Sequence, residues 1–225
     1  KLLQTEPNNN FLVPFAPNDH IRAPTSQQPP LVLIGAQCSG VTTALSSLAH
    51  EAHKRGEAVV HLVIREDTDY PDHKVSFRSF STDICRQLDF PAERSLFHQA
   101  LNSANSISSA VKAISILLES CAELSAEMRE EGNTDGCLLI LDGIYDIVNS
   151  KRIPTKEGEV LFQYVVEFIK SEAARLGIRV ILTGRSFQLV NYLNKHKYSD
   201  RFDFQAIDMP RVRLEDAKAF LANKL

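Results

Sequence analysis

The sequence predicts an α/β domain, a three-layer αβα sandwich around a mostly parallel, five-stranded sheet. Short runs of continuous apolar residues alternate along the chain with longer stretches whose apolar residues repeat at helical spacing. Strands that are apolar at every position are typical of a parallel sheet covered by helices on both faces. The chain has 225 residues, 44% of them hydrophobic, which is enough for one sizeable core and excludes general disorder.

Five segments have the composition of strands. Four are short, mainly apolar runs, and a fifth, weaker run lies near the end of the chain: 31–34, 58–64, 137–141, 178–182 and 202–207. The second run contains His61. We expect this run to be a central strand and His61 to be a hydrogen-bonded core or edge residue.

Four stretches between these runs carry an apolar stripe at helical spacing: 42–55, 77–88, 107–124 and 160–169. Gly56 follows the first stretch and Gly177 the last, as glycines do at helix C-termini. Helices of this kind connect parallel strands through right-handed crossovers.

Three regions are predicted along the chain. Prolines and asparagines punctuate residues 1–30, which we expect to form an irregular arm. Residues 31–210 form the α/β core. Residues 211–225 begin a helical lid, which we expect to continue beyond Leu225 because the chain ends just after this entry helix. A chain that starts at Lys1 rather than Met is also expected to be a piece of a longer protein.

Charge and composition narrow the class of protein. The net charge of −3 gives no whole-domain electrostatic footprint for nucleic acid. The four cysteines form no CxxC pair, so the pattern favours reduced cysteines in an intracellular protein, cytoplasmic or nuclear. No apolar run approaches the roughly 18 residues of a membrane helix, and no basic-then-apolar leader opens the chain, so we expect no membrane association.

The segment 31–45 has the frame of a phosphate-binding loop, G-x-x-x-x-G-K-[ST]. An apolar strand runs into Gly35, Gly40 follows after four residues, and a helix begins at about Thr42. Glycines let successive N–H groups turn inward toward phosphate, and the helix N-terminus adds partial positive charge. Taken alone, the frame also fits an ordinary strand–turn–helix with glycine punctuation. The predicted cradle residues are Gly35, Gln37, Ser39, Gly40, Val41, Thr42 and Thr43.

The lysine of this frame is missing, because Val41 occupies its position. The backbone cradle survives this change, but the point charge on the β- and γ-phosphates is lost. Thr42, which follows the lysine position, supplies the hydroxyl that would ligate Mg²⁺ in such a loop.

Two further strands end in residues suited to the same chemistry. The run 138–141 is followed by Asp142, and this is the pattern in which a carboxylate at a strand end holds Mg²⁺ beside a phosphate loop. The run 178–182 leads into Thr183 and Arg185, a polar and a basic residue that can sense a terminal phosphate. Because open parallel sheets bind ligands at the carboxyl ends of their strands, we expect these residues to meet the loop there.

These segments resemble the additional-strand P-loop NTPases, and within them the signal-transduction (STAND) group that includes NACHT domains. The NACHT second motif, four apolar residues and then Asp-Gly-apolar-Asp-Glu, is similar to residues 138–146, although Tyr145 replaces its first acidic residue. The strand end L-T-S-R is matched by residues 182–185. Residues 204–210 and 214–221 resemble the last strand and the beginning of the lid.

This resemblance implies a nucleotide switch. Asp142 and Thr42 would hold Mg²⁺ with ATP or ADP, Arg185 would be the sensor, and Asp146 would stand in for the glutamate that polarises water. With Val41 and Tyr145 in place, we expect weak or absent hydrolysis. The expected function is a nucleotide-dependent switch or scaffold in a larger signalling protein. Its partners would be the protein's other domains and further subunits, in a homo- or hetero-oligomer.

Two alternatives remain open. Residues 198–202 also resemble the stretch before the last core strand of AAA+ subunits of origin recognition complexes. That alternative would make the chain part of a DNA-binding assembly. The second alternative is a pseudo-NTPase interaction module that kept the fold and lost the ligand.

Overall fold

The computed structural model describes residues 28–35, 39–64, 106–132, 136–149, 153, 155–184, 188–195 and 203–209. The elements in this part follow in the order β1 (Leu31–Ile34), α1 (Val41–Lys54), β2 (Val59–Val63), α4 (Ile107–Glu130), β3 (Leu138–Asp142), α5 (Asp146–Asn149), α6 (Thr155–Phe168), the π-helical turn η2 (Ile169–Ala173), α7 (Ala174–Leu176), β4 (Arg179–Gly184), α8 (Gln188–Lys195) and β5 (Gln205–Asp208). The predicted helix over 77–88, the lid over 211–225 and most of the predicted arm lie outside these residues.

The strands form one five-stranded sheet in the order β2-β3-β4-β1-β5, and every neighbouring pair is parallel. The predicted fold class, an α/β domain with a mostly parallel five-stranded sheet, is therefore confirmed. Strand β4, although late in the chain, lies between β1 and β3. The expectation of a central strand at 58–64 is wrong, because β2 lies at the edge of the sheet.

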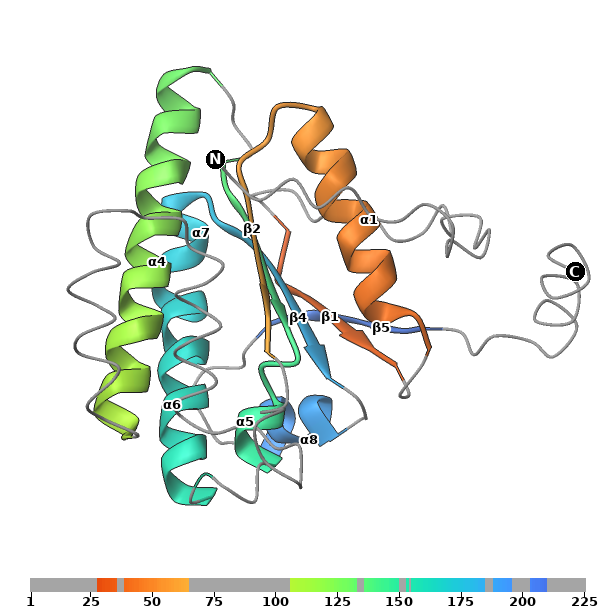
Figure 1. Cartoon of the computed structure of the whole chain (residues 1–225), viewed down its shortest axis with the longest axis vertical. Coiled ribbons are helices and arrows are strands. Elements are labelled where there is room, and N and C mark those ends of the chain that lie inside the picture. Colours follow the sequence, from red (N-terminus) through yellow and green to blue (C-terminus); the bar gives the residue numbers. More distant parts are fainter. Residues whose placement is uncertain are drawn as a thin grey trace, which may run out of the picture.

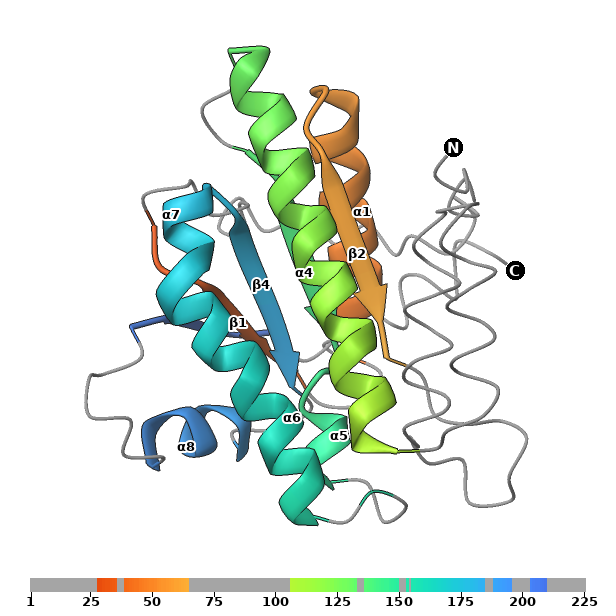
Figure 2. The same ribbon diagram turned by 90° about the vertical axis from the view of Figure 1, so that its left-hand side faces the viewer.

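Helices cover both faces of the sheet. Figure 1 shows α1 on one side of the strands and α4 and α6 on the other, and Figure 2 looks onto the face that α4 and α6 cover. The chain leaves β1 through α1 toward the edge strand β2, and then moves back across the sheet through α4, α6 and α8. Because right-handed crossovers place a helix on the face set by the direction of travel, this reversal puts α1 opposite the other helices.

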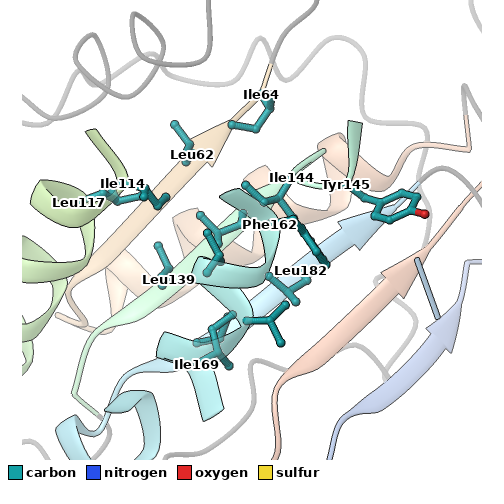
Figure 3. Close-up of a cluster of buried hydrophobic side chains, with 14 of the residues drawn as sticks. Leu62, Ile64, Ile114, Leu117, Leu139, Ile144, Tyr145, Phe162, Ile169 and Leu182 are labelled. Carbon is teal, nitrogen blue, oxygen red and sulfur yellow. The ribbon is translucent and has the colours of Figure 1, made fainter. Parts of the chain in front are cut away.

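Each face has its own hydrophobic cluster. The smaller cluster joins Leu45 and Ala52 of α1 to strand residues that include Ile140 and Ile181. The larger one packs α4, α6 and α8 on the opposite face, and Figure 3 shows part of it around Leu139, Phe162 and Leu182. Side chains alternate between the two clusters along each strand, so β1 and the central residues of β3 and β4 must be apolar on both faces, as the sequence predicts.

The ends of the helices follow from local residues. Ser106 caps α4, and its hydroxyl accepts a hydrogen bond from the N–H of Ser109 at 3.4 Å. Helix α7 ends at Gly177, as predicted from its position after the fourth stripe. None of the helices in the described ranges is long and apolar enough to cross a membrane.

Candidate functional site

The topology has a switch point at the carboxyl ends of β1 and β4. Strand β1 continues into α1 on one face, and β4 continues toward α8, whose Leu189 and Leu193 pack in the cluster on the other face. Adjacent strands whose helices depart to opposite faces leave a gap beyond their carboxyl ends, where open α/β sheets bind ligands. The loop after β1 therefore begins at the place where a ligand site is expected.

Gly35 allows this loop to close tightly. A Cβ atom on Gly35 would lie 2.3 Å from Val41 Cγ2 and 2.4 Å from Ser39 Oγ, closer than side chains can approach. The Gly35 N–H also donates to the Gly184 carbonyl oxygen at 3.2 Å, which ties the loop to the end of β4. The first glycine of the predicted frame is thus required by the way the loop packs.

Gly40 starts helix α1 in the left-handed backbone region, with φ of 82°. In the described part of the loop no side chain caps the helix, and its first turn contains no acidic residue. The first N–H groups of a helix have no partner inside it and carry partial positive charge. Thr42 and Thr43 lie exposed on this first turn. The described helix start therefore offers partial positive charge with no acidic side chain in its first turn, which is compatible with the predicted anion site.

Val41 and Ser39 complete the described part of the loop. Val41 is half-buried and packs against the smaller cluster beneath α1, so its side chain serves the core. The Ser39 hydroxyl is buried and has no hydrogen-bond partner in the structure. A buried hydroxyl without a partner is costly, so Ser39 points to a ligand or solvent molecule inside the loop.

Asp142 ends β3 and is 6% exposed. Its Oδ1 accepts a hydrogen bond from Thr183 Oγ1 at 2.6 Å, and Thr183 Oγ1 accepts one from the Gly143 N–H at 2.8 Å. The other carboxylate oxygen, Oδ2, is buried and has no hydrogen-bond partner among the residues that the structure describes. Ile140 and Ile181 belong to the cluster beneath α1. Because side chains two residues apart on a strand point to the same face, Asp142 and Thr183 lie on the face of the sheet that α1 covers.

His61 lies on the same face of the sheet, in register with Ile140. Burial lowers the pKa of His61, and the negative charge of Asp142 opposes this effect only in part. Its Nε2 is also buried without a hydrogen-bond partner in the structure. The expectation of a hydrogen-bonded histidine is therefore not met at this ring nitrogen, and burial favours the neutral form of His61.

Tyr145 and Asp146 diverge after the Asp142 turn. Asp146 is half-buried and begins α5, where its N–H donates to the Gly143 carbonyl oxygen at 2.9 Å. Tyr145 is 8% exposed and packs edge-on against Phe162 and Tyr192, with ring centroids 5.7 and 5.6 Å away. Figure 3 shows Tyr145 within the larger cluster, so this residue takes no part in the candidate site.

The structure thus places the start of the loop, the start of α1 and Asp142 at the carboxyl ends of the strands and on the same face of the sheet. The predicted site residues Gln37 and Arg185 lie outside the described residues. The sequence predicts that Thr183, at a polar strand end, can sense a terminal phosphate, whereas in the structure its hydroxyl donates to Asp142. Its hydrogen bond to Asp142 depends on the pairing of β3 with β4, which no local pattern reveals.

The donor set fits a magnesium ion held with a nucleotide. In the part of the chain described, no group of three or more His, Cys, Asp or Glu side chains could hold a metal ion alone. Mg²⁺ does not need such a cage, since it is usually bound by one or two protein oxygens together with phosphates and water. The unpartnered Oδ2 of Asp142 and the exposed hydroxyl of Thr42 are oxygens of this kind.

These features define an α/β domain with a five-stranded parallel sheet covered by helices on both faces. No family model and no curated protein matches the sequence. Among solved structures, the Aeropyrum pernix ORC2 protein in its ADPNP–ADP complexes is similar, with a TM-score of 0.49 and 16% identity over 88% of this chain and 45% of that chain. The ADP form of the same protein also has a TM-score of 0.49 and 16% identity, over 89% of this chain and 47% of that chain. The chain therefore spans less than half the length of these structures.

Proposed function

We propose that this chain is a degenerate P-loop NTPase domain that binds ATP or ADP with Mg²⁺. It acts as a nucleotide-dependent switch or scaffold within a larger signalling protein, and its partners are that protein's other domains and further subunits. The observation that carries this proposal is Asp142, whose buried Oδ2 lacks a partner on the face where α1 begins. A carboxylate oxygen left in this state is expected to have a ligand that completes its coordination.

Each described part of the site has a role in this proposal. The N–H groups at the start of α1 bind phosphate oxygens, helped by the partial positive charge of the helix. Thr42 and Asp142 hold Mg²⁺, which when bound neutralises charge on the phosphates. Thr183 fixes the rotamer of the Asp142 carboxylate through Oδ1 and leaves Oδ2 directed to the ion. Gln37 and Arg185 are proposed as further contacts of the nucleotide.

Hydrolysis is proposed to be weak or absent. Phosphoryl transfer depends on positive charge near the transferred group, and Val41 supplies none. Tyr145 is buried in the core, so Asp146 is the remaining candidate for the carboxylate that orients water. The missing lysine at Val41 and the buried Tyr145 also favour a second candidate function, a pseudo-NTPase interaction module without ligand.

A binding experiment separates the two functions. The purified protein is denatured and the released small molecules are analysed, and ATP and ADP are then titrated by calorimetry with Mg²⁺. We expect bound nucleotide or micromolar affinity, which Thr42→Arg abolishes by filling the start of α1. His50→Arg, an exposed position further along α1, is the matched control and should leave affinity unchanged. Absence of binding at millimolar nucleotide would favour the interaction module.

The same preparation tests the origin-recognition alternative. Binding of duplex DNA whose affinity falls steeply with salt would favour that alternative, because phosphate contacts release counterions. DNA binding that is weak and independent of salt would count against it.

A further inference from the structure

Three aromatic rings join the turn after β3 to helices α6 and α8. Tyr145 lies in that turn, Phe162 on α6 and Tyr192 on α8. Each ring contacts the other two edge-on, with centroids 5.7 Å apart for Tyr145 and Phe162, 5.6 Å for Tyr145 and Tyr192, and 5.3 Å for Phe162 and Tyr192. Because aromatic pairs prefer such edge-on geometry, displacing one ring disturbs its contacts with both others. We call these three residues the aromatic triad.

The turn that links Asp142 to Tyr145 is held at several points. Gly143 has a φ of 80°, and its N–H donates to Thr183 Oγ1 at 2.8 Å. The Gly143 carbonyl oxygen accepts a hydrogen bond from the Asp146 N–H at 2.9 Å. A turn constrained in this way moves largely as one unit, so a displacement of Asp142 also displaces Tyr145.

Helix α8 is anchored to the site at two places. Leu189 is buried against Gly184, where an added Cβ would lie 2.8 Å from Leu189 Cβ. The Gly184 carbonyl oxygen in turn accepts the Gly35 N–H at 3.2 Å, at the start of the loop after β1. Tyr192 follows about one helical turn after Leu189, on the same side of α8, and contacts Tyr145. Figure 1 and Figure 2 both show α8 close to the carboxyl end of β4.

We propose that bound nucleotide fixes the position of α8, and that the aromatic triad transmits this effect from Asp142. The inference rests on the proposed function and names the element that the switch moves. A ligand that contacts both the start of α1 and Asp142 sets the spacing between the loop and the turn after β3. Gly184 follows the loop and Tyr145 follows the turn, so the two anchors of α8 take one spacing. Closely packed interiors pass such a change on as a shift of the packed helix, because they have no free volume in which to absorb it.

Hydrogen exchange of the unmodified chain tests this inference without a substitution. Amide exchange is followed by mass spectrometry with and without ADP and Mg²⁺, at concentrations that calorimetry shows to be saturating. We expect the amides of α8 to exchange about 5-fold or more slowly with nucleotide, because both anchors are then fixed. The second half of α4, residues 119–130, is the internal control and should not change, since it lies toward the amino ends of the strands (Figure 1).

Two outcomes of this experiment are decisive. Equal exchange of α8 with and without bound nucleotide would overturn this inference and leave the proposed function intact. Absence of calorimetric binding would overturn the proposed function, and this inference with it.

Two substitutions of Tyr145 test the route through the triad. Tyr145→Phe keeps the ring, whereas Tyr145→Leu removes it and leaves an apolar side chain. We expect both variants to bind nucleotide, but only Tyr145→Phe to keep the slower exchange of α8. A purely structural role would change the exchange of α8 equally with and without nucleotide. A full response of α8 in Tyr145→Leu would contradict the role given to the triad.

A fluorescence measurement provides a second readout if Tyr145→Leu does not fold. The chain contains no tryptophan, so Tyr192→Trp places a single fluorophore in the triad. Phe168→Trp, at a half-buried position at the end of α6, is the matched control. Saturating ADP and Mg²⁺ should shift the emission of Tyr192→Trp and leave that of Phe168→Trp unchanged. Unchanged emission of Tyr192→Trp, with calorimetric binding retained, would overturn the inference.

Discussion

Thr183 Oγ1 donates a hydrogen bond to Asp142 Oδ1 at 2.6 Å, across the pairing of β4 with β3. The same hydroxyl accepts a hydrogen bond from the Gly143 N–H at 2.8 Å. One side chain therefore fixes both the carboxylate and the turn that follows it. This arrangement occupies one carboxylate oxygen and leaves the other, Oδ2, for a ligand.

Replacing Thr183 with valine should weaken both the fold and the site. The substitution keeps the shape but removes the hydroxyl, so the buried Asp142 Oδ1 and the Gly143 N–H lose their partner. We expect a loss of about 1–3 kcal/mol in the free energy of unfolding, measured with urea. Affinity for magnesium nucleotide should fall as well. Thr183→Ser keeps the hydroxyl and should restore most of the affinity, whereas equal losses in both variants would contradict this role.

Replacing Gly35 with alanine should disrupt the loop. The new Cβ would lie within 2.4 Å of both Val41 Cγ2 and Ser39 Oγ, so loop or helix must move. Gly136→Ala is the matched control, because Gly136 precedes β3 at the amino ends of the strands, away from the site, and its new Cβ would clash with the Gly177 carbonyl oxygen. Thermal unfolding should show both variants destabilised, but calorimetry should show weaker nucleotide binding only for Gly35→Ala. A similar drop in affinity for both would argue against the loop assignment.

Replacing Tyr145 with glutamate should not restore hydrolysis. The substitution restores an acidic residue where the NACHT second motif has one. The structure, however, places Tyr145 in the core against Phe162 and Tyr192. A carboxylate there would be buried without a partner, and we expect a loss of at least about 2 kcal/mol in stability. Tyr145→Phe should be nearly neutral. Faster ATP hydrolysis by a stable Tyr145→Glu variant would show that the side chain reaches the site.

Glu57 binds a buried arginine at the amino ends of the strands, opposite the candidate site. Its Oε2 accepts a hydrogen bond from Arg179 Nη2 at 3.0 Å, and Arg179 is 3% exposed. Glu57→Gln would leave this guanidinium without its counterion, and we expect a loss of about 3 kcal/mol at neutral pH. Glu51→Gln is the control, since its ion pair with Lys54 spans 3.7 Å between side chains more than half exposed, and should cost less than about 0.5 kcal/mol.

The same ion pair predicts a pH dependence. Burial raises the pKa of Glu57, but hydrogen bonds from Arg55 and Arg179 outweigh this and hold its pKa below the ordinary 4.5. Because the folded pKa is lowered, the stabilisation is fully present above the unfolded value and is lost as the pH falls through the folded pKa. Urea unfolding measured from neutral to acidic pH should show this loss in the unmodified chain and a shallower slope in Glu57→Gln. Parallel slopes would contradict the pairing.

The order of elements could be predicted from the sequence with small errors at the ends. The run 137–141 becomes β3 (Leu138–Asp142), and the stripe over 42–55 becomes α1 (Val41–Lys54). These predictions succeed because buried parallel strands and amphipathic helices leave periodic patterns along the chain itself. The loop frame is predictable for the same reason, because its glycines are required by the backbone conformation of the loop itself.

The sequence by itself determined the class of fold, the loop after β1 and the carboxylate at the end of β3. Only the tertiary structure decided that β2 is an edge strand, that Tyr145 turns into the core and that Thr183 binds Asp142 over a separation of 41 residues. Local patterns depend on a residue and its near neighbours, so a single sequence displays them. The order of strands and the direction of a side chain after a turn depend on which distant segments pack together, and residue periodicity carries no record of that choice.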